Sequence, residues 1–278
     1  MVTYLKECYP VSISRACRVA NLPKSMYYYK NVRDDSETIG KLLELSEKHP
    51  TEGQDLYYSR IRLEGLRWNY KRVRRVYRLL GMNRRRKVRR RVPARVKLPL
   101  LVPQRPGQMW SMDFMSDVLT SKRKFRTLNI IDDYNRQAIT VEVAHTMPAT
   151  RVIQILERTI KEQGKPECIR VDNGPEFISK EFKDWCLDNG IRIQYTQPGK
   201  PMQNGYIERF NRTFRENILD AYLFEDIVQV QILADEWMDD YNYNRPHESL
   251  GGVTPDYYRQ LKRGDIENSI EFPTSPHF

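Results

Sequence analysis

The sequence predicts an α/β protein: a mixed five-stranded sheet with flanking helices, preceded by an all-α helix-turn-helix region. Three observations support this fold class. Residues 107–278 contain three strand patterns joined by turns, followed by alternating helical and strand patterns. Residues 1–83 contain only helical periodicities. The charge also changes along the chain: residues 1–106 hold 26 Lys and Arg against 9 Asp and Glu, and the remainder holds 21 against 27.

The composition limits the class of protein further. The chain has 278 residues, of which 40% are hydrophobic, and this is enough for about two domains with real cores. No apolar run approaches the ~18–20 residues of a membrane span, and the N-terminus lacks the order of a secretory signal. The four cysteines form no Cys-x-x-Cys pair. We therefore expect a soluble cytoplasmic protein without a membrane segment, a zinc ribbon or a disulfide framework.

Short helices around tight turns are predicted in the first 83 residues. Ser12 or Ser14 can cap a helix that is interrupted near Asn21 and Pro23, and Ser25 can begin another. Further helices are predicted over residues 37–48, 56–64 and 70–80. Pairs of short helices joined by a turn are typical of helix-turn-helix units, which bind DNA.

The helix predicted over residues 70–80 combines an apolar stripe with a basic surface. Val73, Val76, Tyr77 and Leu80 recur at helical spacing. Basic side chains cover the rest of the helix: Lys71, Arg72, Arg74, Arg75 and Arg78. Such a helix suits a groove lined with phosphates, and the alternative is an ordinary amphipathic helix with a charged solvent face.

A strongly basic segment follows this helix. Seven of eight consecutive residues are basic: Arg84, Arg85, Arg86, Lys87, Arg89, Arg90 and Arg91. Because like charges in such a run repel one another, we predict a solvated arm that contacts nucleic acid. Together with the prolines that follow, it forms a predicted linker, residues 84–106, after a helical DNA-binding region, residues 1–83.

The α/β part is predicted to contain five strands: residues 110–119, 126–132, 138–144, 168–171 and 191–195. Helices are predicted between and after them: residues 149–163, 180–188, 205–222 and 228–241. The first three strands form a meander, whereas the last two alternate with helices, so one mixed sheet is expected. This domain is predicted to span residues 107–263, followed by a loosely ordered tail, residues 264–278.

Three acidic residues differ from the other acids of this part in their placement. Asp113 interrupts an apolar strand, and Asp172 ends another strand before the turn Asn173-Gly174. Glu208 lies near the start of the helix that opens after Gly205. Ligands of open α/β sheets bind at strand ends, so the three carboxylates can converge there. Taken singly, each acid is also explained as a turn residue or as a favourable charge at a helix N-terminus.

Three carboxylates gathered in one site repel one another unless cations compensate them. All-oxygen ligands favour Mg²⁺ or Mn²⁺ over Zn²⁺, and no His or Cys lies within three residues of these positions in the sequence. Two such ions would activate an attacking oxygen and stabilise a departing one at phosphorus. Asp113, Asp172 and Glu208 are therefore predicted to bind metal and to catalyse.

Polar and basic neighbours extend this candidate site. Asn173 and Asn204 are predicted to position phosphate or a metal-bound water, with turn capping as the alternative. Glu176, four residues after Asp172, is predicted to have a supporting or structural role rather than to be the third ligand. Contacts with DNA are predicted for four basic residues: Lys200, Arg209, Arg212 and Arg215.

Several motifs resemble those of a known family. The three main ones are Trp110-Ser111-Met112-Asp113-Phe114, Val171-Asp172-Asn173-Gly174-Pro175-Glu176-Phe177 and Gly199-Lys200-Pro201-Met202-Gln203-Asn204-Gly205-Tyr206-Ile207-Glu208-Arg209-Phe210-Asn211. Thirty-five residues separate Asp172 from Glu208. A later motif is Tyr243-Asn244-Arg245-Pro246-His247-Glu248-Ser249-Leu250-Gly251. The series resembles the Asp-Asp-Glu core of retroviral integrases and bacterial insertion-sequence transposases. Nearly the whole chain is similar to the OrfB product of the large two-frame insertion-sequence family.

The resemblance implies an RNase H-like fold and two Mg²⁺ ions per active site, with Mn²⁺ as a substitute. It implies a DDE transposase that binds double-stranded DNA, both transposon ends and target, and catalyses phosphodiester hydrolysis and strand transfer. It also implies a homodimer or higher oligomer, because two DNA ends must be held together. Fusion with, or binding to, an upstream-frame product and association with the bacterial nucleoid are further expectations.

Three alternatives stand beside this interpretation. Another RNase H-like nuclease should lack the N-terminal helix-turn-helix units. A retroviral-type integrase would carry a His-His-Cys-Cys zinc module, whereas none of the four His is paired near Cys8 and Cys17. A DNA-binding regulator with an inactive core is disfavoured by the intact acid trio.

Overall fold

The computed structural model describes residues 1–29, 34–83, 103–196 and 204–261. Arg84 to Arg91, Lys200 and the tail predicted over residues 264–278 lie outside the described residues. The chain divides into two compact units, residues 1–41 and 42–278. None of the described helices is long and apolar enough to cross a lipid bilayer.

The first unit contains three short helices, α1 (Val2–Cys8), α2 (Ile13–Val19) and α3 (Lys24–Tyr27). The Ser12 side chain caps α2 by accepting a hydrogen bond from the Arg15 backbone N–H at 3.3 Å. Asn21 follows α2 with a φ of 51°, in the left-handed region that asparagine tolerates. Val2, Ala16 and Cys17 form the small core of this unit.

Three further helices lie in the chain before the sheet: α4 (Ser36–Lys48), α5 (Gln54–Leu63) and α6 (Tyr70–Leu79). All three were expected from the sequence within a few residues. The predicted stripe of α6 is buried at Val73, Val76 and Tyr77. Its basic side chains Lys71, Arg74, Arg75 and Arg78 are exposed, whereas Arg72 is half-buried with its guanidinium 5.7 Å from the Trp68 ring.

The sheet has five strands: β1 (Trp110–Val118), β2 (Lys124–Asp132), β3 (Ala138–Ala144), β4 (Cys168–Val171) and β5 (Arg192–Tyr195). Their order is β3-β2-β1-β4-β5. The β1–β2 and β2–β3 pairs are antiparallel, whereas β4 runs parallel to both β1 and β5. This is the mixed sheet of an RNase H-like fold, and the predicted fold class is confirmed.

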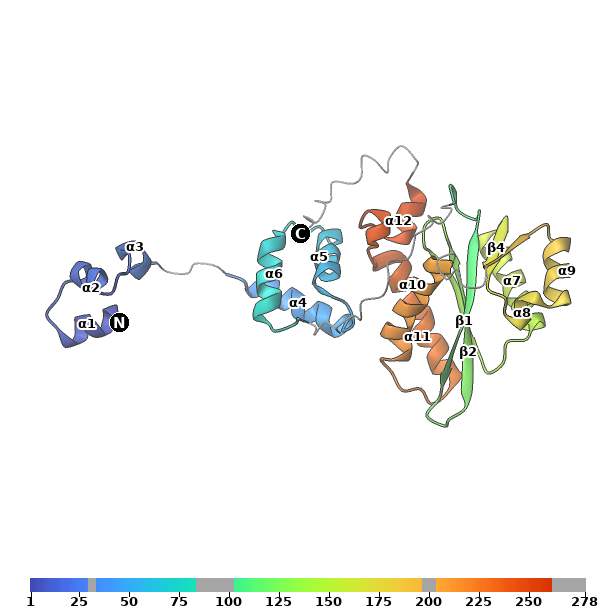
Figure 1. Ribbon diagram of the computed structural model, residues 1–278, viewed down its shortest axis with the longest axis horizontal. Coiled ribbons are helices and arrows are strands. Elements are labelled where there is room, and N and C mark those ends of the chain that lie inside the picture. Colours follow the sequence, from blue (N-terminus) through green and yellow to red (C-terminus); the bar gives the residue numbers. More distant parts are fainter. Residues whose placement is uncertain (30–33, 84–102, 197–203, 262–278) are drawn as a thin grey trace, which may run out of the picture. The chain divides into compact units, whose positions relative to one another are not determined.

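Helices cover both faces of the sheet (Figure 1). One face carries α7 (Ala149–Gln163), α8 (Pro175–Ile178) and α9 (Lys180–Asp188), and the other carries α10 (Gly205–Phe214) and α11 (Ile227–Asp239). Successive side chains of a strand point to opposite faces. Met112 of β1 packs in the core with α7 and α9, and Met115 packs in the core with α10 and α11. Asp113 shares the parity of Met115 and therefore faces α10.

The long helices predicted over residues 205–222 and 228–241 are interrupted. A π-helical turn, η2 (Arg215–Leu219), follows α10, and another, η3 (Asp240–Asn244), follows α11. A π turn inserts an extra residue into the helical repeat. As a result, two consecutive side chains can be buried, Ile218 with Leu219 in η2 and Tyr241 with Asn242 in η3. The chain then enters α12 (Pro255–Gln260).

Candidate active site

Two of the predicted acids lie on adjacent parallel strands. Ser111 of β1 is level with Arg170 of β4. If the same register is continued by two residues, Asp113 is level with Asp172. At this point β4 has ended, whereas β1 continues. Asp172 is exposed at this strand end, whereas Asp113 is half-buried inside β1.

The third acid reaches this place from a helix. Glu208 lies in the first turn of α10, and Asn211, one turn later, donates a hydrogen bond to Asp113 Oδ2 at 2.7 Å. The pKa of Asp113 is raised to about 6, chiefly by burial, with the negative charges of Asp172 and Glu208 adding to it. The charges of Asp172 and Glu208 therefore act on the Asp113 carboxyl. The oxygens of the three acids do not all lie within 4.8 Å of one another in the described structure, so the group is open.

The turn after β4 fixes the position of the Asp172 carboxylate. Its Oδ1 accepts a hydrogen bond from the Gly174 backbone N–H at 3.0 Å. A Cβ atom added at Gly174 would lie only 3.0 Å from that same oxygen. A side chain at this position would push the carboxylate aside, which explains the glycine of the Asp-Asn-Gly motif.

The negative charge of a neighbouring acid, Glu176, is balanced by an arginine. Glu176 forms an ion pair with Arg126, whose guanidinium lies 4.2 Å from the centroid of the Phe114 ring. Phe114 in turn stacks on Phe177, with 4.8 Å between the ring centroids. These contacts favour the structural role expected for Glu176.

Sequence reasoning missed two asparagines that support the site. Asn129 lies opposite Asp113 in the β1–β2 ladder and donates a hydrogen bond to Asn211 Oδ1 at 2.7 Å. Asn211 passes the interaction on to Asp113, and both asparagines are buried. The signal was available, because Asn211 is a polar residue at i+3 from Glu208 beside the apolar stripe of its helix.

The two asparagines that the sequence did single out have different surroundings. The Asn173 amide donates to the Thr196 carbonyl at 3.2 Å, which ties the end of β4 to the end of β5. Asn204 precedes α10 and is buried, and its Oδ1 has no partner among the described residues. The Asn173 side chain thus has a structural partner, whereas the Asn204 oxygen has none in the described part of the chain.

The basic residues of this region also differ from one another. Arg215 pairs with Asp117 at 3.2 Å and donates to the Ser116 carbonyl at 3.1 Å. Arg209 and Arg212 are exposed on α10. Arg215 is therefore engaged within the protein, and Arg209 and Arg212 present their charge to solvent.

The sheet order, with Asp113 and Asp172 on adjacent parallel strands, is that of an integrase-type polynucleotidyl transferase core. Residues 103–201 and 189–255 match two family models, each described as integrase core domain. An insertion element IS407 protein of Burkholderia multivorans is 31% identical over 96% of this chain and 98% of its own length. An insertion element IS476 protein of Xanthomonas euvesicatoria is 34% identical over 95% of this chain and 77% of its own length.

The chain belongs to this family of insertion-element proteins and is the DDE transposase of an insertion sequence. Integrase-like enzymes of this kind use divalent metal ions. Among solved structures, the catalytic core domain of HTLV-2 integrase in complex with magnesium is 20% identical, with a TM-score of 0.46, over 56% of this chain and 99% of that one.

Proposed function

We propose that Asp113, Asp172 and Glu208 are the catalytic, metal-binding residues of this transposase. The observation that carries the proposal is geometric: the β1–β4 register places Asp113 level with Asp172, and Glu208 lies one turn before Asn211, which donates to Asp113. In agreement with this arrangement, the pKa of Asp113 is raised to about 6, by burial and by the two further carboxylates. Bound cations would remove both causes of that shift, because they would neutralise the repulsion and solvate the buried charge. The donor set consists of oxygens alone and fits Mg²⁺, with Mn²⁺ as a substitute.

Each residue has a definable task in the proposed site. Asn211 holds Asp113 Oδ2 and the Phe114 backbone N–H holds Oδ1, so that each oxygen keeps a lone pair for a cation. Gly174 holds Asp172 in the same way. Two Mg²⁺ ions bound there would supply activation of the attacking oxygen and stabilisation of the departing one.

The proposed reaction has two in-line displacements at phosphorus. In the first, a water oxygen attacks a phosphodiester at the end of the element, and the P–O bond to the 3′ oxygen breaks to release a 3′-OH. In the second, that 3′ oxygen attacks a phosphodiester of target DNA and displaces the target's own 3′ oxygen. The number of phosphodiester bonds is conserved in the second step, so no further energy source is required.

We further propose that the remaining parts of the chain hold DNA. Residues 1–83 would be the DNA-binding region with helix-turn-helix units, residues 84–106 a linker, residues 107–263 the catalytic domain and residues 264–278 a tail. The exposed basic side chains of α6 support phosphate contacts there. A homodimer or larger assembly on two DNA ends, partnership with an upstream-frame product and nucleoid association stay predictions from the family resemblance.

A metal-dependence assay tests the proposed chemistry. The full chain is incubated with duplexes that carry the element's own ends, and released 3′-OH ends and joined products are measured. Mg²⁺ or Mn²⁺ should support both steps, and EDTA should abolish both until metal is restored. Cleavage that continues in EDTA would refute the metal-binding role of the trio.

The basic run outside the described residues can be tested separately. Neutralising Arg84 to Arg91 should weaken binding to every DNA sequence. The slope of log K against log salt should fall by about 0.9 for each phosphate that the variant no longer neutralises. An unchanged slope would place the DNA contacts elsewhere in the chain.

A further inference from the structure

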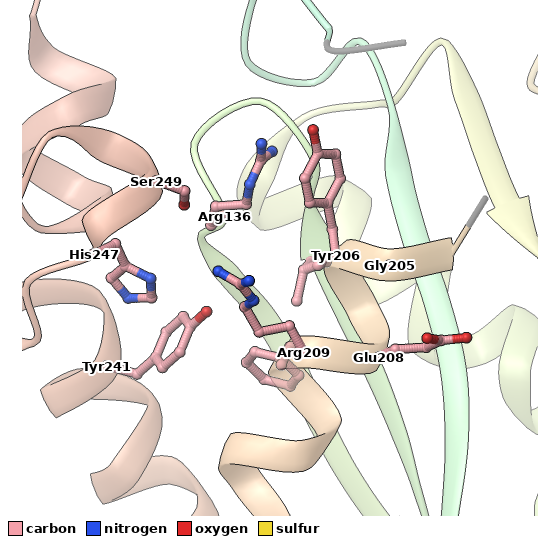
Figure 2. A pocket seen from close by; sticks show the side chains of 10 residues that line it. Arg136, Gly205, Tyr206, Glu208, Arg209, Tyr241, His247 and Ser249 are labelled. Carbon is pink, nitrogen blue, oxygen red and sulfur yellow. The ribbon is translucent and has the colours of Figure 1, made fainter. Parts of the chain in front are cut away.

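A pocket of about 430 Å³ lies beside the candidate active site. Its walls come from the first turns of α10, the turn between β2 and β3, and the segment that follows η3. Figure 2 shows Arg136, Arg209 and His247 around this space. The Glu208 carboxylate points away from them (Figure 2), so one end of α10 presents an acid on one side and cations on another.

Arg136 occupies an unusual backbone position at this pocket. Its φ is 62°, in the left-handed region that a non-glycine residue seldom adopts. Its guanidinium lies 3.4 Å from the centroid of the Tyr206 ring. Two of its nitrogens, Nε and Nη1, are buried without a hydrogen-bond partner in the described part of the chain. Strained residues of this kind cluster at sites that bind ligands.

The charges around the pocket are unbalanced. Asp133 is the acid whose charge acts on Arg136, but it is already paired with Arg170 at 2.6 Å. Arg209 adds a second positive charge. His247 adds none, because burial and the nearby arginines lower its pKa to about 3. Glu208 is the acid among the residues that line the pocket, and its carboxylate points away from the two guanidinium groups (Figure 2).

The backbone adds to this positive potential. The helix α10 has ten residues and begins at Gly205, which lines the pocket. The first N–H groups of a helix have no partner within it, and the helix dipole is positive at this end. Anions, and phosphates in particular, bind at such positions. The shape of the pocket, the unpaired guanidinium nitrogens and the polarity of the helix therefore all favour an anionic ligand.

We propose that this pocket binds a DNA phosphodiester close to the one that reacts. The proposal rests on the proposed function, because a strand whose reacting phosphate reaches Glu208 passes the first turn of α10. Guanidinium groups suit phosphate, since their N–H donors match its oxygens in pairs. The phosphate belongs either to the element end or to the target, which present the same chemistry.

Two variants and a matched control test the pocket. Arg136→Asn removes the guanidinium and leaves a residue that tolerates positive φ. Arg209→Gln removes the second charge from an exposed position, where loss of the fold is not expected. Arg158→Gln is the control, because Arg158 lies on the surface of α7 and pairs with Glu142 at 2.6 Å.

Binding is measured against salt concentration on two duplexes, one with the element end and one with target DNA. Each pocket variant should bind the duplex that occupies the pocket roughly tenfold more weakly at low salt. The slope of log K against log salt should fall by about 0.9 for that duplex alone. The control should keep the wild-type slope on both duplexes.

Uncharged methylphosphonate groups, placed singly along the affected duplex, locate the phosphate. At one position near the reacting bond, the wild type should lose about the same affinity as Arg209→Gln loses on ordinary DNA. The variant should lose nothing further at that position. Equal sensitivity of wild type and variant at every position would overturn the proposal, as would wild-type slopes for both variants on both duplexes.

A parallel cleavage assay separates this proposal from the proposed function. Cleavage by the wild type in Mg²⁺, and its loss in Asp172→Asn, depend on the acid trio alone. Normal cleavage combined with unchanged salt slopes would refute only the phosphate pocket. Absent wild-type cleavage combined with the predicted slope changes would refute only the catalytic proposal.

Discussion

Two groups of acidic side chains in the described part of the second unit differ in their partners: arginines neutralise one of them, and neutral groups hold the other. Arg60 donates to both carboxylate oxygens of Glu52 at 2.8 Å and to Asp240 at 2.8 and 3.1 Å, and Arg245 donates to Glu52 at 2.7 Å. Asp113, by contrast, receives hydrogen bonds from neutral groups, the Asn211 amide and the Phe114 N–H. The first group is an internal clamp, whereas the second is the proposed site for external cations.

Closeness alone would have selected a different group. The ligand atoms of His49, Glu52 and Asp240 all lie within 4.8 Å of one another, which is tighter than in the proposed catalytic trio. Yet the guanidinium of Arg60 already fills that space, and its own pKa is raised by these acids. Within the described residues, the absence of a neighbouring cation, rather than the distance between oxygens, therefore distinguishes the proposed metal site from the structural ion cluster.

The largest expected effect contrasts one acid from each group. Asp172→Asn should lower cleavage and joining by roughly a thousandfold or more, because a proposed metal ligand is lost. DNA binding should be retained or improved, since a negative charge near phosphate is removed. Asp240→Asn should keep the Mg²⁺ dependence of the wild type. Gel assays of cleavage measure both, and equal activity of Asp172→Asn with the wild type would end the metal proposal.

The clamp should matter for stability rather than for chemistry. Glu52→Gln leaves Arg60 and Arg245 without their shared partner in a buried place, which should cost about 3–5 kcal/mol of unfolding free energy. Glu44→Gln is the matched control, because Glu44 pairs with Lys48 on the surface and should cost less than about 1 kcal/mol. Urea denaturation compares the two, and equal losses would mean that Glu52 forms no clamp.

The sequence predicted the strands well because their pattern is local. Alternating apolar residues placed β1 to β5 within a few residues, and the turn-joined meander indicated their antiparallel order. The π turns η2 and η3 were missed, since they arise where helices must bury two consecutive side chains against a core. That requirement comes from tertiary packing and leaves no helical period to detect.

In the candidate site, too, features that depend on local sequence were predicted, and features that depend on tertiary packing were not. Asp113, Asp172 and Glu208 were chosen because strand ends and family motifs are legible along the chain. The clamp was invisible, because Arg60 and Asp240 are 180 positions apart in sequence. The role of Arg136 was not predicted for a similar reason. Its backbone strain and unpaired nitrogens exist only once β2, β3 and α10 are assembled.

A smaller effect is expected when the neutral side chain that donates a hydrogen bond to Asp113 is removed. Asn211→Ala removes the amide that positions Asp113, and such a loss beside a metal ligand typically lowers metal affinity or activity 10- to 100-fold. The Mg²⁺ concentration required for half-maximal cleavage should rise. Asn173→Ala, which instead removes the hydrogen bond between the ends of β4 and β5, should leave that concentration nearly unchanged. An unaltered Mg²⁺ requirement in Asn211→Ala would show that Asp113 is positioned without it.

The smallest expected effect is a gain of stability. Burial and repulsion raise the pKa of Asp113 to about 6 in the folded chain, so its ionised form opposes folding when metal is absent. The carboxyl therefore stabilises the fold below about pH 4, and this contribution is lost as the pH rises through about 6. At pH 7.5 without metal, Asp113→Asn should be more stable than the wild type by about 1–2 kcal/mol, after allowance for the partial exposure of the carboxyl to solvent. Near pH 4 the difference should vanish, and Mg²⁺ should raise the melting temperature of the wild type alone. A variant less stable than the wild type at pH 7.5 would mean that the charge of Asp113 is compensated within the protein, as the charges of the clamp are.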